Sequence, residues 1–136
     1  MYLFDKVVFK IKNARVLSLK EIQKYQKFYK EQEKKKKEKL RQRYFQAWSL
    51  ARKAAKILYQ EYKAQKVVVF GSLRNIELFS EWSDVDIAVW GINPELYYKA
   101  VASVISLSPI FKIDIVDPDD CQEALKKTII KEGIVI

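Results

Sequence analysis

The sequence contains no histidine, and its 136 residues include a single cysteine, Cys121. The absence of histidine excludes Ser-His-Asp and Cys-His catalysis, and one cysteine cannot replace the imidazoles of most zinc sites. Any bound metal would therefore have oxygen ligands, which favours Mg²⁺, Mn²⁺ or Ca²⁺. A lone cysteine also excludes an intrachain disulfide, so we expect a reducing, cytoplasmic environment.

Long apolar runs are also missing. No stretch of about 18 apolar residues is present, so no membrane span is expected. Charged side chains interrupt the first 20 residues, which lack the apolar region and cleavage site of a signal peptide. The apolar fraction of 49% is nevertheless sufficient for a core, and the length fits one domain with an appendage.

Charge is distributed unevenly along the chain. Residues 1–65 carry 19 Lys and Arg against 6 Asp and Glu, whereas residues 66–136 carry 7 against 11. A basic N-terminal half therefore precedes a mildly acidic half, and the two are best interpreted separately.

The basic half is predicted to be a long helix. Ser18 and Glu21 form a capping-box pattern, and neither Gly nor Pro follows until Gly71, which predicts a helix over residues 19–62. Residues 2–12 resemble one or two short strands. The final third of the helix has apolar residues at spacings of three or four, which should pack on a sheet. These are Leu40, Tyr44, Ala47, Trp48, Ala51, Ala55, Leu58 and Tyr62.

The middle of this helix is polar on all sides and includes the run Lys34–Lys37. A solvated helical face is the preferred interpretation, and contact with nucleic-acid phosphates or with a partner protein is the alternative. No aromatic residues interleave the lysines, which disfavours a stacking platform for single strands. A second contact surface, suited to self-association or a heteromer, could be formed by Ile22, Tyr25, Phe28 and Tyr29.

The acidic half alternates strands and helices, which predicts an α/β layer with a mixed sheet and helices on at least one face. Asn93 before Pro94 and Asp117 before Pro118 are typical of helix starts, and Gly133 is typical of a helix end. The expected strands are 66–70, 84–90, 111–116 and a short edge strand at 134–136, and the expected helices are 73–77, 93–107 and 117–133.

Three aspartates lie in or beside these strands. Asp84 and Asp86 are two residues apart and should share one strand face, and Asp114 joins them if its strand is a neighbour. Three convergent carboxylates could hold two Mg²⁺ ions for phosphoryl transfer, and these cations would offset the repulsion between the carboxylates. Gly71-Ser72, at a turn before a helix, suits a phosphate. Taken alone, each residue has a structural explanation, as a turn residue, a helix cap or a solvent-facing strand residue.

Residues 71–86, GSLRNIELFSEWSDVD, resemble the GS-x(10–11)-D-x-D signature of the polymerase-β-type nucleotidyltransferase superfamily, and more closely the minimal nucleotidyltransferases. The resemblance implies a nucleotidyltransferase domain over residues 54–136, preceded by the strands and basic helix of residues 1–53. It implies that Gly71 and Ser72 hold the triphosphate of ATP, and that Asp84 and Asp86 bind two Mg²⁺ ions. Asp114 would complete the metal site and help to deprotonate the attacking hydroxyl.

Minimal members of that family are commonly antitoxins paired with HEPN proteins, which are RNases. The resemblance therefore implies transfer of AMP from ATP to a tyrosine hydroxyl of a HEPN toxin. Two alternatives stay open at this point. One is a nucleotidyltransferase that acts on a small molecule or RNA, and the other is a catalytically inactive module that binds a partner protein or nucleic acid.

Overall fold

The structure is a computed structural model that describes residues 17–136. The strands expected in residues 2–12 lie outside the described residues. Contacts divide the chain after Glu38, and the compact unit Lys39–Ile136 contains the whole sheet. The boundary that we expect between residues 53 and 54 stays a prediction.

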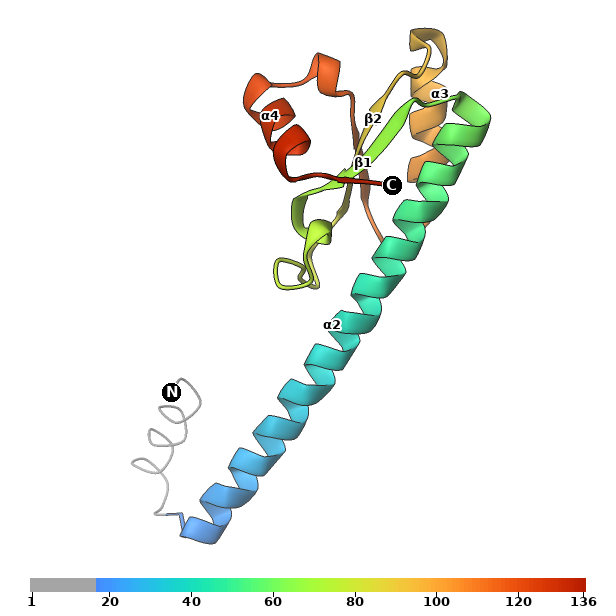
Figure 1. The fold of residues 1–136 in the computed structure, drawn as a ribbon. Helices are drawn as coiled ribbons and strands as arrows, with labels where there is room; N and C mark the ends of the chain where they lie inside the picture. The colour runs from blue at the N-terminus through green and yellow to red at the C-terminus, as the bar shows by residue number, and fades with distance from the viewer. Residues whose placement is uncertain (1–16) are drawn as a thin grey trace. The chain divides into compact units, whose positions relative to one another are not determined.

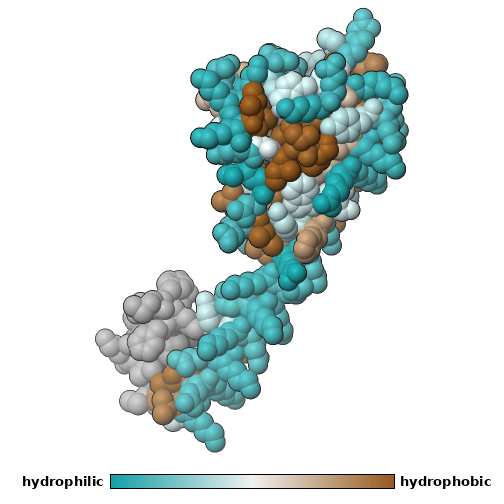
Figure 2. Space-filling view, in the orientation of Figure 1, coloured by the Kyte–Doolittle hydropathy of each residue, from teal (hydrophilic) through white to brown (hydrophobic). Residues whose placement is uncertain are grey.

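Helix α2 (Leu19–Tyr62) has the bounds that the sequence predicts. The Ser18 hydroxyl accepts a hydrogen bond from the Glu21 amide at 3.2 Å, which satisfies one of the unpaired N–H groups of the first turn. The apolar positions predicted for its final third are confirmed as buried or partly buried in the core of the second unit, together with Leu50 and Ala54. Hydrophilic side chains cover the middle of α2 (Figure 2).

The sheet has four strands in the order β3-β2-β1-β4. β1 pairs antiparallel with β2 and with β4, whereas β2 and β3 are parallel. The sheet is therefore mixed, as predicted, and the C-terminal strand lies at its edge. The strands are β1 (Lys66–Phe70), β2 (Val85–Trp90), β3 (Ile113–Val116) and β4 (Ile134–Val135).

Helices cover both faces of this sheet (Figure 1). On one face, α3 (Pro94–Ile105) and the last turns of α2 share a core with Val67, Val69 and Ile87. On the other face, α4 (Glu123–Glu132) packs Ile129 against a smaller cluster around Val68 and Ala88. Alternation along each strand assigns side chains to the two faces, so the acids of β2 and β3 belong to a defined side.

The prediction of a short helix over residues 73–77 is wrong. The chain instead forms a 3₁₀-helix, η1 (Gly71–Arg74), and Asn75 is extended with φ −149° and ψ 127°. The Asn75 side chain accepts a hydrogen bond from the Glu77 amide at 3.0 Å. Asparagine offers the backbone this local alternative to a helix, which explains why the helical turn stops here.

The prediction that the last helix begins at Asp117 is also wrong. Asp117 caps only the 3₁₀-helix η2 (Pro118–Asp120), by accepting a hydrogen bond from the Asp119 amide at 2.9 Å. Cys121 is then extended, with φ −136° and ψ 174°, and α4 begins two residues later. The cap pattern was identified correctly, but it closes a single tight turn. The helix end at Gly133 is confirmed.

Within residues 17–136, no helix combines the length and the apolar content that a membrane crossing needs.

Candidate active site

Two of the predicted acids meet across neighbouring strands. Asp86 is the second residue of β2 and Asp114 the second residue of β3, and the parallel register pairs them directly. Their carboxyl groups are close enough to hydrogen-bond to each other. The aspartate in an otherwise apolar β3 therefore faces the aspartate of β2, as the alternation of strand side chains predicts.

This pairing changes the acidity of Asp86. Its pKa rises from 3.8 to about 6, first because the carboxyl is partly buried and then because Asp114 and Asp84 are negatively charged. The hydrogen bond with Asp114 raises the pKa further, and the Lys112 ammonium lowers it. Negative charge on Asp86 is therefore unfavourable in this site, and a bound cation or a proton would relieve it.

Gly71 lies against the same carboxylate. β1 ends at Phe70, which pairs with Asp86, so the next residue reaches the acid pair directly. Gly71 has φ +71°, and a Cβ atom there would collide with Oδ2 of Asp86. Only glycine combines this backbone conformation with so close an approach. Ser72 follows in η1 and is partly exposed.

Asp84 is placed less tightly. It immediately precedes β2, which begins at Val85. The charge of Asp84 raises the pKa of Asp86 less than the charge of Asp114 does. Among residues 17–136, no three acidic, cysteine or histidine side chains are grouped closely enough to hold a metal ion. The structure thus brings together Asp86, Asp114 and Gly71, and it leaves Asp84 next to this group.

The donor set of the site is nevertheless suited to a hard cation. Three carboxylates with a shared excess of negative charge are the ligands that Mg²⁺ prefers. Asp86 and Asp114 are within hydrogen-bonding reach of each other, and the charge of Asp84 acts on Asp86 as well. The residues therefore fit an oxygen-ligated divalent ion.

Lys112 is a site residue that sequence reasoning missed. Its Nζ atom lies 3.6 Å from Oδ1 of Asp114, on an exposed part of the surface. The signal was present, since Lys112 and Asp114 are two residues apart at the start of a strand and point to the same face. Part of the carboxylate charge is consequently balanced by the protein itself.

Arg43 of α2 is a second residue that was missed. Its guanidinium donates a hydrogen bond to the carbonyl of Ser83 at 3.3 Å and lies 4.3 Å from the ring centroid of Phe111. Ser83 precedes Asp84, and Phe111 lies three residues before Asp114. One side chain thus contacts the backbone leading into β2 and the segment leading into β3. Helical spacing places Arg43 beside Leu40, three residues earlier, but it could not identify Ser83 and Phe111 as partners.

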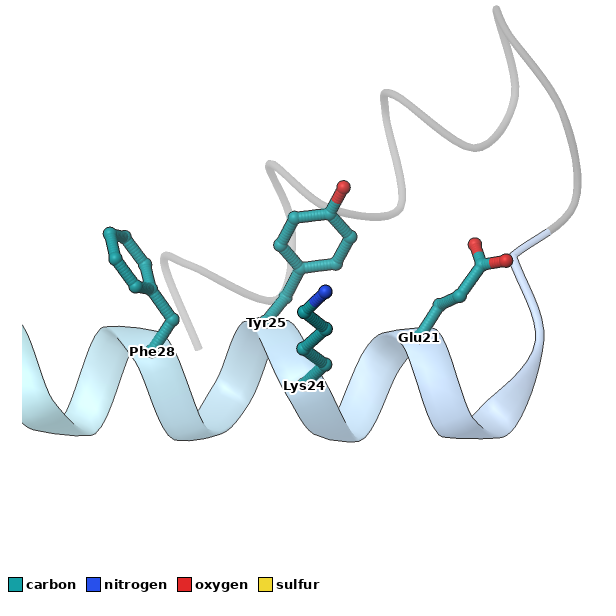
Figure 3. Close-up of a pocket in the computed structure, with 4 residues that line it drawn as sticks. All are labelled: Glu21, Lys24, Tyr25 and Phe28. Atoms are coloured by element: carbon teal, nitrogen blue, oxygen red, sulfur yellow. The ribbon is translucent and has the colours of Figure 1, made fainter.

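A separate pocket lies on the first part of α2. It has a volume of about 490 Å³, and its described lining is Glu21, Lys24, Tyr25 and Phe28 (Figure 3). Tyr25 and Phe28 belong to the predicted second contact surface, and both side chains are mainly exposed. An apolar surface of this kind is compatible with the partner expected from the sequence, which stays a prediction.

The family model of the polymerase β nucleotidyltransferases matches residues 52–136. The chain belongs to this family. The match supports a nucleotidyltransferase activity in general, and the mixed sheet with its flanking helices is consistent with a nucleotidyltransferase fold. A comparison with individual curated proteins finds no match. The nucleotidyltransferase match begins within α2 and contains all five predicted site residues, whereas Arg43 lies before it.

Proposed function

We propose that this nucleotidyltransferase transfers AMP from ATP to a tyrosine hydroxyl of a HEPN toxin, depends on Mg²⁺, and acts as an antitoxin. The observation that carries the catalytic part is the contact between Asp86 and Asp114 beside Gly71. The resemblance of residues 71–86 to the minimal nucleotidyltransferases supports the choice of partner.

In this proposal each site residue has a chemical role. Gly71 allows the backbone to approach the triphosphate, and Ser72 contributes a hydroxyl at the same turn. Asp84, Asp86 and Asp114 would hold two divalent cations. When bound, such cations neutralise phosphate charge and stabilise the attacking and leaving oxygens.

The transfer is an in-line displacement at the α-phosphorus. The acceptor oxygen forms a bond to that phosphorus, the bond to the bridging oxygen of the β-phosphate breaks, and pyrophosphate leaves. The hydroxyl proton passes to Asp114, which acts as the general base on the β3 side of the pair. Asp86 lies between Asp114 and the Gly71 turn, so the acceptor would bind on the Asp114 side and the triphosphate on the Gly71 side.

The test is transfer of labelled AMP to a candidate HEPN protein in the presence of MgCl₂. We expect label on the partner with the unmodified chain and with Asp119→Asn, an acid of η2 outside the site. Label should be lost in the double variant Asp84→Asn, Asp86→Asn. Undiminished labelling by that variant would contradict the mechanism, and labelling of RNA or a small alcohol instead would correct the acceptor.

A second function has two structural observations in its favour. Lys112 already pairs with Asp114, and within the described residues Asp84, Asp86 and Asp114 are not gathered into a metal-binding group. Both features would suit a catalytically inactive core that neutralises a partner protein or binds nucleic acid. Calorimetry separates the two functions, because only the enzyme is expected to bind ATP in a Mg²⁺-dependent manner.

A further inference from the structure

The loop Asn75–Ser83 links η1 to β2, so its two ends adjoin Ser72 and Asp84. It exposes three large apolar side chains, with exposed fractions of 40% for Ile76, 48% for Leu78 and 84% for Trp82. Exposing several such side chains to water within one short loop is unfavourable for an isolated protein. Such exposure is typical of an interaction surface.

The loop has a defined conformation. The Leu78 amide donates to the Asn75 carbonyl at 3.0 Å, and the Phe79 amide donates to the Ile76 carbonyl at 3.2 Å. Phe79 is buried, and its ring meets that of Tyr44 edge-on with 5.3 Å between the centroids. The exposed residues are therefore presented by a loop that is anchored in the core.

The second half of the loop is held equally well. The Trp82 amide donates to the Ser80 hydroxyl at 3.2 Å, and the Ser83 amide donates to the Ser80 carbonyl at 3.1 Å. The hydrogen bond from Arg43 to the Ser83 carbonyl ties this end to α2. Such preorganisation lowers the entropy that a partner must overcome on binding.

The chemistry of the loop specifies the partner. Glu77 and Glu81 are exposed between the apolar residues, and the loop contains no Lys or Arg. Its surface therefore complements an apolar patch surrounded by basic side chains. Trp82 projects from the surface, whereas small-molecule sites are concave, so a protein surface fits better.

We propose that the loop Asn75–Ser83 is the docking surface for the protein acceptor, and that it binds a basic, apolar patch next to the tyrosine to be modified. This inference rests on the proposed function. Trp82 is the central contact, as exposed tryptophans commonly are in interfaces, and the two glutamates select a basic partner.

The probe is a fluorescently labelled peptide, Lys-Leu-Lys-Tyr-Lys-Leu-Lys, compared with a counterpart in which every Lys is replaced by Glu. Binding is measured by anisotropy, and transfer is measured with ATP and MgCl₂. We expect at least about tenfold tighter binding of the basic peptide. Trp82→Ala should weaken its binding and raise its KM about tenfold, with kcat and the KM for ATP unchanged.

Tyr98→Ala is the matched control, because Tyr98 is also an aromatic residue with 84% exposure and lies on α3. The Tyr98→Ala variant should leave peptide binding unchanged. The double variant Glu77→Lys, Glu81→Lys should instead prefer the acidic peptide to the basic one. Equal effects of Trp82→Ala and Tyr98→Ala, or equal binding of both peptides, would overturn the docking surface. Binding that depends on Trp82 without transfer would support the surface and contradict the tyrosine acceptor.

Discussion

Asp86 lies directly across the β2–β3 pairing from Asp114, with the two carboxyl groups within hydrogen-bonding reach. Burial of the Asp86 carboxyl, and then the negative charge of Asp114 beside it, raise the pKa of Asp86 from 3.8 to about 6. A bound cation would lower the free-energy cost of ionising both carboxyl groups. This relationship gives the site a measurable dependence on protons and on divalent cations.

The first prediction concerns pH. Because the pKa of Asp86 is about 6 in the folded state against 3.8 ordinarily, the folded state binds this proton more tightly than the unfolded state. Ionisation of Asp86 therefore opposes folding as the pH rises from about 4 to about 6, and the cost is complete above that range. Asp86→Asn should remove it and raise the Tm above about pH 6.

Thermal unfolding followed by circular dichroism in EDTA checks this prediction. The Tm difference between Asp86→Asn and the unmodified chain should grow from about pH 4 to about pH 6.5 and then level off. Asp119→Asn is the control, because Asp119 pairs with Lys126 at 3.2 Å rather than with another acid. A Tm difference independent of pH would show that the carboxyl contact does not affect stability.

The sequence predicts the elements whose signals are local and strong. Helix α2 was predicted correctly at both ends: the Ser18 cap marks its start, and no Gly or Pro interrupts it. The convergence of Asp86 and Asp114 followed from a period of two and from the pairing of β2 with β3. The errors at Asn75 and Asp117 occur where a side chain that can cap a helix instead closes a tighter turn.

Long-range contacts were beyond sequence reasoning. Arg43 lies 40 residues from Ser83, and no periodicity indicates that a polar helix position will reach the start of a strand. The rigid Asn75–Ser83 loop was equally hidden, because its anchor depends on Phe79 meeting Tyr44 of α2. Tertiary partners of this kind follow only when the packing of helix on sheet is known.

The second prediction compares two glycines. Gly71 and Gly91 both have positive φ, at +71° and +83°, so an alanine at either position should cost about 1–2 kcal/mol. The new Cβ would also collide with a side chain at both positions, with the Asp86 carboxylate at Gly71 and with the exposed Gln65, outside the site, at Gly91. Nucleotide transfer should fall at least about a hundredfold for Gly71→Ala and little for Gly91→Ala.

Urea unfolding gives the stability of both variants, and initial rates give their activity. Similar losses of activity in the two variants would show that backbone strain, and not contact with Asp86, is responsible.

The third prediction concerns Arg43. Its Nε atom is buried and, within the described part of the chain, has no hydrogen-bond partner, while its guanidinium stacks on Phe111. Arg43→Ala should remove the stacking contact and the hydrogen bond to Ser83, at a cost of about 2 kcal/mol. Because Ser83 and Phe111 precede Asp84 and Asp114, kcat should fall about tenfold, with the KM for ATP less affected.

Arg41→Ala is the matched control, since Arg41 is exposed on the same helix and lies 5.7 Å from the ring centroid of Phe45. Arg43→Lys should recover little activity, because an ammonium cannot stack and donate in the planar geometry of a guanidinium. Full recovery with lysine would mean that only the charge of residue 43 matters.

The last prediction concerns metal binding. A divalent ion that binds the folded state stabilises it in proportion to the logarithm of its concentration, by about 2.7 kcal/mol at a hundred times its Kd. MgCl₂ should therefore raise the Tm of the unmodified chain. EDTA should lower this Tm again, and an excess of MgCl₂ added afterwards should restore it. Asp114→Asn should reduce this shift, because Asp114 is half of the acid pair that would hold the ion. Asp119→Asn should keep the full shift, because Asp119 lies on η2 and pairs with Lys126. An equal Mg²⁺ shift in all three proteins would place the ion elsewhere, and it would leave the carboxyl contact of β2 and β3 without its expected role.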